Sequence, residues 1–454
     1  MAAGGDQWTG RLGFVLATIG SAVGLGSIWK FPYEVGENGG GGFVLFYLLG
    51  LVAIVTPLML AEFAIGRAGK ADARAALQAV ARTHGASPWW QVVGVLGVVG
   101  SALILSFYSV IGGWALAYAV ETLWQGLPAG ATAAQARLDG FLASPLHMVV
   151  YHTAFMTLTA AIVGKGIAGG IEAATRILMP VLAVLMVLLA GYSLIVGDAA
   201  AAFVYLFSFD PARLTPGMML EAIGLGFFSI GVGMAVMITY AAYAGPDIDL
   251  RSAAVIAVVG DTVISFLAGF AIFPIVFGNG LDPASGPGLM FVTLPVAFSG
   301  MPGGALVAVA FFILLVVAAL ASAMSLLEMP VAFVRSSLDW TRHRAVAVMA
   351  GAIWLAGLFS VFSFNLWRDW FPLSPYPIFA SATFFDLIDY LTSNLLLPAG
   401  GVMLACFAGW VLPVRFFADT LDLGKTATRL LRLALRYLVP AGVTAAALLP
   451  FTGR

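Results

Sequence analysis

Charged residues are scarce in this chain, since Asp, Glu, Lys and Arg make up 9% of its 454 residues, whereas soluble domains average about 25%. Hydrophobic residues make up 61%, and the mean hydropathy is +1.01. A composition this poor in charge excludes an ordinary soluble domain. It predicts an all-α polytopic membrane protein.

The chain also has only one cysteine, and the common cofactor motifs do not occur in it. The single cysteine, Cys406, excludes an intrachain disulfide, and a net charge of −1 gives no reason to expect a nucleic-acid partner. The four histidines, His84, His147, His152 and His343, show no metal-ligand spacing, and no Gly-x-x-x-x-Gly-Lys loop occurs. With no nucleophile–base pair either, we expect neither an enzyme nor an organic cofactor, and no obligate protein partner is evident.

Eleven apolar segments are long enough to cross a bilayer. They cover about 11–35, 42–66, 91–124, 147–164, 171–196, 219–242, 251–278, 303–334, 345–362, 384–411 and 430–450. No low-complexity linker separates them, so residues 1–454 read as a single transmembrane domain. Most of the 21 lysines and arginines fall on one side, which predicts a multi-pass protein of the inner (plasma) membrane with a cytoplasmic N-terminus and, for an odd number of spans, an external C-terminus.

The first and sixth spans are each interrupted by closely spaced glycines: Gly20, Gly24 and Gly26 in the first, and Gly231 and Gly233 in the sixth. Glycine lowers the cost of leaving the helix. A helix broken at membrane depth frees backbone groups that a ligand can satisfy. The alternative is that these glycines only allow close packing between helices.

Paired discontinuous helices, five spans apart, are typical of secondary transporters built from two inverted five-helix repeats. In this chain the repeats would cover about 11–196 and 219–411, and an extra helix would follow at 430–450. The binding site of such a transporter lies at the two breaks.

Several ordered motifs resemble those of a known family. They are Arg11-Leu12-Gly13, the glycine-rich stretch 20–32, Gly36-Glu37-Asn38-Gly39-Gly40-Gly41, Glu62-Phe63-Ala64-Ile65-Gly66-Arg67, Phe107-Tyr108-Ser109, Gly113-Trp114, Gly170-Ile171-Glu172, Phe227-Phe228-Ser229 and Asp389-Tyr390-Leu391. Over nearly its whole length the chain resembles the neurotransmitter:sodium symporter family, in particular its prokaryotic amino-acid transporter branch with the LeuT-like fold. The resemblance implies alternating access, one or two Na⁺ ions, an amino-acid substrate and a lipid bilayer around the protein.

The resemblance also implies a substrate site. The substrate carboxylate would lie against the amides of Leu25 and Gly26 and the hydroxyl of Tyr108, because exposed amides at a half-helix end attract an anion. The substrate amine would meet carbonyls around Ala22 and Phe228. The Phe228 ring would also close the pocket from outside.

Monoamine carriers of the family place an aspartate where Gly24 stands, so its absence favours substrates that carry their own carboxylate. The rest of the pocket is mainly apolar, which favours a neutral, medium-to-large apolar amino acid. The alternative is that these side chains only pack against each other. The expected substrate-binding residues are Ala22, Gly24, Leu25, Gly26, Ile104, Tyr108, Phe228, Ser229, Gly231, Met234, Ser322 and Leu326, with Ser325 beside them.

Two sodium sites follow from the same resemblance. The first would comprise the Ala22 carbonyl and the side chains of Ser27, Ser229 and Asp261. The second would comprise the carbonyls of Gly20, Val23 and Ala318 and the hydroxyl of Ser322. Three departures bear on them: Ser27 stands in place of the usual asparagine, Asp261 stands where many relatives have an asparagine, and Ala321 stands in place of a threonine that normally donates an oxygen.

Asp261 bears on chloride as well as sodium, since a carboxylate within a span is by default a functional hypothesis. The chain keeps Tyr47 and Ser265 of the family's chloride site, but Leu225 replaces its glutamine. A fixed negative charge and a missing donor together suggest chloride independence. The alternative is that Asp261 caps a helix near its cytoplasmic start.

Gates are expected at both ends of the site. Lys30 and Asp389 match the family's external gate pair, with a lysine in place of the usual arginine. At the inner end, Gly5 and Ser336 stand where relatives have a salt bridge, so that bridge cannot form and only packing by Trp8 would plug the inner vestibule. We therefore expect an inward-open state that is easier to reach.

Taken together, these patterns predict a sodium-coupled symporter that imports a neutral, apolar amino acid. Two alternatives remain open: a sodium-independent or proton-coupled carrier, favoured by Ser27 and Ala321, and a sensor of the same fold that binds amino acids without transporting them.

Overall fold

A computed structural model describes residues 7–283 and 288–448, and the regular structure in these ranges is helical. Nine helices in the described ranges are long and apolar enough to cross a bilayer. They are formed by α3 (Gly41–Gly50) with α4 (Thr56–Gly69), α6 (Gln91–Gln125), α8 (Pro145–Gly164), α9 (Ala173–Val196), α13 (Leu250–Gly278), α15 (Gly304–Leu338), α16 (Arg342–Ser363), α17 (Phe384–Tyr390) with α18 (Leu397–Cys406), and α20 (Lys425–Leu433) with α21 (Val439–Leu448).

The first and sixth expected spans are each built from two shorter helices. α1 (Arg11–Ala22) is followed by the segment Gly26–Glu37, which ends in α2 (Phe31–Glu37), and the two halves are bent by 51°. The second broken span consists of α11 (Pro216–Ile230) and α12 (Val236–Ala242), each too short to cross a bilayer by itself. The predicted discontinuous helices are thus confirmed, and nine of the eleven predicted spans are continuous.

Backbone conformation explains where each break falls. Val23, at the end of α1, is extended, with φ −81° and ψ 102°. Between α11 and α12, Gly231, Gly233 and Ala235 have φ of 68°, 92° and 59°, values that glycine adopts at little cost and that alanine rarely adopts. Neither stretch can therefore continue the helix that precedes it.

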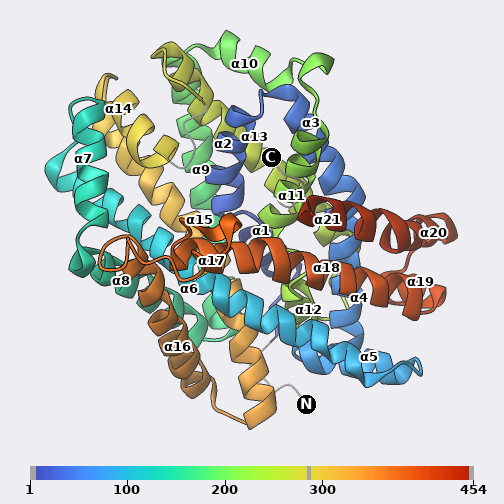
Figure 1. The fold of residues 1–454 in the computed structure, drawn as a ribbon. Coiled ribbons are helices and arrows are strands. Elements are labelled where there is room, and N and C mark those ends of the chain that lie inside the picture. The colour runs from blue at the N-terminus through green and yellow to red at the C-terminus, as the bar shows by residue number, and fades with distance from the viewer. Residues whose placement is uncertain (1–6, 284–287, 449–454) are drawn as a thin grey trace.

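The broken helices lie in the middle of the bundle (Figure 1). The two longest helices, α6 and α15, pack along each other, and α1 packs against α9, α13 and α15. In the second broken span, α11 packs against α3, and α12 packs against α4. This arrangement brings both breaks together inside the protein, whereas the exact extent of the two inverted repeats stays a prediction.

Short helices between the spans mark the two ends of the bundle. α7 (Ala131–Leu142), α10 (Ala199–Phe207) and α14 (Leu294–Ser299) lie toward one end, at the top and left of Figure 1. α5 (Ala73–Thr83) and α19 (Val414–Leu421) lie toward the lower right. The predicted external position of the C-terminus falls on residues outside the described ranges.

Candidate functional site

A cavity of about 60 Å³ lies where the two breaks meet. Nearly all of the predicted substrate-binding residues line it; Ala22 does not, although it is buried nearby. The lining also includes four residues that were not predicted for the substrate site: Ser21, Ile230, Val236 and Leu397. The structure therefore assembles in one place the residues that the family resemblance had selected from four separate spans.

The cavity has a polar end. The Leu25 N–H, at the start of the second half of the first span, donates to the Tyr108 hydroxyl at 3.3 Å. A Cβ atom at Gly24 would lie 2.5 Å from Ser322 Oγ and 3.0 Å from the Tyr108 hydroxyl oxygen. No side chain of any kind, an aspartate included, fits at Gly24 without moving these groups. The Leu25 N–H and the Tyr108 O–H at this end are donors from which a substrate carboxylate can accept hydrogen bonds.

The other walls of the cavity are apolar. Ile104, Met234 and Leu326 are all buried and face the same space. Gly231 has no side chain, and a Cβ there would meet nothing within 4 Å. The flexible thioether of Met234 and the open space at Gly231 allow the pocket to adjust to apolar groups of different size.

Next to the cavity is a cluster of hydroxyls around one carboxylate, which we call the carboxylate cluster: Ser27, Tyr47, Ser229, Asp261 and Ser265. Ser27 Oγ donates to Asp261 Oδ1, and it lies 2.9 Å from Ser229 Oγ. Ser229 Oγ lies 3.3 Å from the same carboxylate oxygen. The Tyr47 hydroxyl donates to Asp261 Oδ2 at 2.8 Å and lies 3.3 Å from Ser265 Oγ.

Asp261 is fully buried, and no described Lys, Arg or His side chain forms an ion pair with it. A buried carboxylate needs hydrogen bonds or a cation to offset lost hydration. The alternative that Asp261 caps a helix is wrong: it lies in the middle of α13, whose cap is Asp249, which accepts from the amides of Arg251 and Ser252. The oxygens of this cluster suit a small hard cation.

A second group of oxygens, the carbonyl cluster, lies at the end of α1. Ser322 Oγ is 3.4 Å from each of the carbonyl oxygens of Gly20, Ser21 and Val23. Free carbonyls at a helix C-terminus carry partial negative charge. Of the predicted members, Gly20, Val23 and Ser322 converge here, and the Ser21 carbonyl joins them.

Ala318 and Ala321 lie on the same stretch of α15 as Ser322, and both are buried. The methyl of Ala321 faces the cluster, because a Cβ at Gly20 would lie 3.3 Å from it. An apolar methyl therefore stands where a hydroxyl would extend the ligand set.

The second broken span is held by Glu62 of α4. Its two carboxylate oxygens accept from the Gly233 amide at 2.6 Å and the Met237 amide at 2.9 Å. Free amides at the start of a helix favour a negative group, so this buried carboxylate fixes the start of α12 and the strained turn before it.

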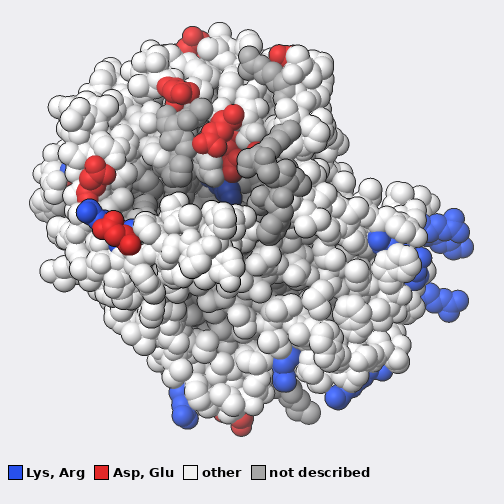
Figure 2. Space-filling view, in the orientation of Figure 1, with Lys and Arg blue, Asp and Glu red and all other residues white. Residues whose placement is uncertain are grey.

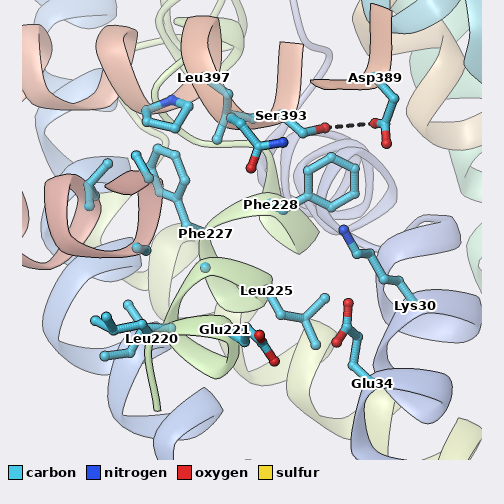
Figure 3. A pocket seen from close by; sticks show the side chains of 17 residues that line it. Lys30, Glu34, Leu220, Glu221, Leu225, Phe227, Phe228, Asp389, Ser393 and Leu397 are labelled. Carbon is cyan, nitrogen blue, oxygen red and sulfur yellow. Dashed lines mark hydrogen bonds between the residues drawn. The ribbon is translucent and has the colours of Figure 1, made fainter. Parts of the chain in front are cut away.

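A larger cavity of about 400 Å³ lies outside the substrate cavity, and we call it the outer vestibule (Figure 3). Lys30, Glu34, Glu221, Phe228 and Asp389 all line it. Figure 3 shows the lysine amine beside the phenylalanine ring, and Nζ is 4.5 Å from the ring centroid. Acidic side chains gather around a hollow on this face in Figure 2.

In this conformation the two predicted gate residues point to different partners. The Asp389 carboxylate accepts from Ser393 Oγ at 2.8 Å, while Lys30 lies over Phe228. Both side chains are described, and no ion pair joins them. Gate closure by Lys30 and Asp389 therefore stays a prediction, although both residues do line the entrance to the site.

At the inner end, Trp8 packs as predicted. It is buried, its ring nitrogen donates to the Tyr240 carbonyl at 2.9 Å, and its ring contacts Phe14 and Tyr240 edge to face. Ser336 Oγ donates to Asp72 at 2.5 Å. Gly5, the other half of the predicted missing bridge, lies outside the described residues.

Sequence reasoning missed an inner ion pair between Glu328 and Arg342. Arg342 Nη2 is 2.5 Å from Glu328 Oε2, the carboxylate is fully buried, and the Tyr243 hydroxyl donates to it at 3.2 Å. A carboxylate inside the apolar run of α15 was a signal that could have identified it. The inner face thus has an ion pair of its own, at positions other than those where the family's bridge was expected.

Comparisons with known proteins agree with this geometry. The family model of the sodium:neurotransmitter symporter family matches residues 5–138 and 144–366. The chain is 36% identical over 403 residues to an uncharacterized sodium-dependent transporter, YhdH, of Bacillus subtilis, covering 88% of this chain and 87% of that one. It is 32% identical over 415 residues to an uncharacterized sodium-dependent transporter of Haemophilus influenzae, covering 90% and 89%.

A solved structure is similar over the whole fold. The crystal structure of MhsT in complex with L-phenylalanine superposes with a TM-score of 0.89 at 41% sequence identity, and the match covers 99% of this chain and 100% of that one. The fold of this chain therefore has an experimental counterpart, which was crystallised with L-phenylalanine.

Proposed function

Because the chain belongs to the sodium:neurotransmitter symporter family, whose members are membrane transporters and not enzymes, we propose that this sodium-coupled transporter imports a neutral amino acid with an apolar side chain. One observation carries the proposal: the same small cavity has a carboxylate-binding end at Leu25 and Tyr108 and apolar walls at Ile104, Met234 and Leu326. The relative MhsT, crystallised with L-phenylalanine, makes that amino acid the first candidate.

We assign coupling sodium to the two oxygen clusters. In the carboxylate cluster Asp261 supplies the charge, and Ser27 and Ser229 supply further oxygens. In the carbonyl cluster the end of α1 and Ser322 supply neutral oxygens. Both clusters adjoin the breaks that line the substrate cavity, so sodium binding would order the backbone that the substrate contacts, and each ligand would raise the affinity of the other.

Transport is expected to be independent of chloride. The Tyr47 hydroxyl, one of the groups that could bind chloride, already donates to the Asp261 carboxylate. A second anion beside this buried carboxylate would be repelled. The protein would act in the plasma membrane with its lysine- and arginine-rich side in the cytoplasm.

Uptake into proteoliposomes tests the proposal. We expect radiolabelled L-phenylalanine to accumulate when an inward sodium gradient is imposed, and to accumulate equally when gluconate replaces chloride. Tyr108→Phe, which removes only the hydroxyl facing Leu25, should raise the half-saturating phenylalanine concentration. Binding that is equally tight with and without sodium at fixed ionic strength would contradict the sodium assignments, and tight binding without uptake would favour a sensor.

A second candidate is coupling to a proton or to a single sodium ion, and the methyl of Ala321 beside the carbonyl cluster favours it. In this case a pH gradient imposed in sodium-free buffer would drive uptake, or one sodium ion would accompany each substrate. Measuring accumulated ²²Na⁺ and phenylalanine in the same vesicles separates these outcomes from two-sodium symport.

A further inference from the structure

The last described span begins with a strongly basic helix face. Lys425, Arg429, Arg432 and Arg436 follow one another at spacings of four, three and four residues, which places them along one side of a helix. No acidic residue occurs from 423 to 448. α20 projects from the bundle at the right of Figure 1, and Figure 2 shows Lys and Arg gathered at that projection.

Two of these arginines converge on one backbone oxygen. The Nε atoms of Arg432 and Arg436 donate to the Gly409 carbonyl at 3.3 Å and 2.7 Å. The backbone approaches so closely here that a Cβ at Gly409 would lie 3.0 Å from the Arg436 backbone nitrogen and Cγ. The Arg436 guanidinium lies over the Trp410 ring, 4.9 Å from its centroid. Both guanidinium groups are therefore held in place as neighbours.

Their charges are not neutralised by the protein. No carboxylate among the described residues forms an ion pair with Arg432 or Arg436, whereas Arg176, Arg251 and Arg342 each have one. Like charges one helical turn apart repel. Each arginine uses only its Nε atom in the hydrogen bond to Gly409, so its Nη donors remain available to an anion. The paired N–H donors of a guanidinium group match the spacing of two phosphate oxygens.

The surroundings of the pair are apolar and exposed. Trp410, Leu433, Tyr437 and Leu438 are each 53–55% exposed, and the Trp410 and Tyr437 rings meet edge to face at 5.7 Å. Exposed tryptophan and tyrosine at the end of a span are typical of the membrane–water interface. A partner that satisfies both the guanidinium pair and this apolar surface must carry an anionic head and acyl chains.

We propose that Arg432 and Arg436, with Trp410 beside them, form a binding site for the phosphate of an anionic phospholipid in the leaflet that the charge distribution predicts to be cytoplasmic. The lipid headgroup would neutralise the two guanidinium groups, and its chains would cover the exposed leucine side chains. Lys425 and Arg429 extend the positive surface toward the headgroups. The site is independent of the proposed substrate.

Native mass spectrometry of the purified protein, titrated with phosphatidylglycerol, phosphatidylcholine or inorganic phosphate, tests this site. We expect one phosphatidylglycerol to bind per chain about thirtyfold more tightly than phosphatidylcholine, since each of the two interfacial arginines is worth roughly 1 kcal/mol. Arg432→Gln with Arg436→Gln should remove that preference. The control, Arg82→Gln with Arg415→Gln, removes two exposed charges on the same side and should keep the preference.

Three results would overturn the proposal. Equal binding of the two lipids by the unaltered protein would show no anionic site. Equal loss of preference in both double variants would show a diffuse charge effect. Binding of inorganic phosphate that phosphatidylglycerol does not displace would show a site for free phosphate. If the glutamine variant does not fold, Arg432→Lys with Arg436→Lys is used instead. It keeps both charges but removes the paired guanidinium donors, and should weaken the preference for phosphatidylglycerol by about threefold.

Discussion

The carboxylate cluster and the carbonyl cluster lie on opposite sides of the break in the first span, and they are built differently. The carboxylate cluster has five side chains, one of them a carboxylate, and each member is hydrogen-bonded to at least one other. The carbonyl cluster has one side-chain hydroxyl, from Ser322, and otherwise uses the backbone at the end of α1.

The difference indicates how each cluster would bind a cation. A buried carboxylate attracts a cation strongly but is costly to leave unneutralised. Backbone carbonyls carry only partial charge, and they come together only when α1 ends at Val23. We therefore expect the carboxylate cluster to determine whether sodium binds. The carbonyl cluster should only change the sodium affinity, and only in the conformation in which α1 ends at Val23.

The largest expected effect is that of Asp261→Ala. Removing the only carboxylate of its cluster should raise the sodium concentration for half-maximal phenylalanine binding about a hundredfold. The effect is large because polar interactions with a charged group are stronger than those between neutral groups. A scintillation-proximity assay over a sodium series measures it. The control, Asp419→Ala, removes an exposed aspartate and should leave the half-maximal sodium concentration unchanged. Sodium stimulation that survives Asp261→Ala would reverse the ranking of the two clusters.

Gly24→Ala should have the next largest effect. The new methyl would lie 2.5 Å from Ser322 Oγ and 3.0 Å from the Tyr108 hydroxyl. Overpacking of this kind costs about 2 kcal/mol, which corresponds to roughly thirtyfold weaker phenylalanine binding. Because Gly24 contacts the carbonyl cluster and not the carboxylate cluster, sodium should still raise the melting temperature.

Gly191→Ala is the matched control, because a Cβ there would meet nothing within 4 Å. Substrate binding by this variant should be unchanged. Equal losses in the two glycine variants would mean that helix flexibility, and not contact with Ser322 and Tyr108, is the property that matters.

Sequence alone selected most of the residues that line the substrate cavity, and their roles in binding stay predictions. Three glycines in one apolar run predicted the first break, and a carboxylate in a span singled out Asp261. In the structure the two signals meet, because Ser27, just after the first break, donates to Asp261 and contacts Ser229 of α11. Motif matching located the two breaks because Gly20–Pro32 and Phe227–Ser229 are short, ordered stretches, whereas Asp261 and Ser322 lie outside the quoted motifs.

What the sequence did not predict depends on contacts between distant segments or on conformation. Glu328 and Arg342 pair across the end of α15 and the start of α16, and neither belongs to a recognisable motif. Lys30 was expected to pair with Asp389, but in this structure its amine lies over the Phe228 ring. The apolar run around Glu328 marks this carboxylate as unusual, but the sequence does not identify Arg342 as its partner or Phe228 as the partner of Lys30.

Ser322→Ala tests the carbonyl cluster directly. It removes the only hydroxyl there and leaves the carbonyls of Gly20 and Val23 in place. Loss of one neutral oxygen should weaken sodium binding about tenfold, less than the loss expected for Asp261→Ala. Ser101→Ala on α6 is the control, because this buried hydroxyl bonds to a carbonyl of its own helix and does not line the substrate cavity.

Ala321→Thr should have the smallest effect and the opposite sign. The Ala321 methyl faces Gly20 at the end of α1, so a threonine hydroxyl there can join the carbonyl cluster. The added oxygen should strengthen sodium binding, and overpacking at this buried position should offset part of the gain, which leaves about a threefold improvement. Ala323→Thr makes the same change elsewhere on α15, where a hydroxyl would bond to the preceding turn, and should give no improvement. If Ala321→Thr also raises the number of sodium ions carried per substrate, the carbonyl cluster of the natural protein does not hold an ion through the transport cycle, and the carboxylate cluster alone couples sodium to uptake.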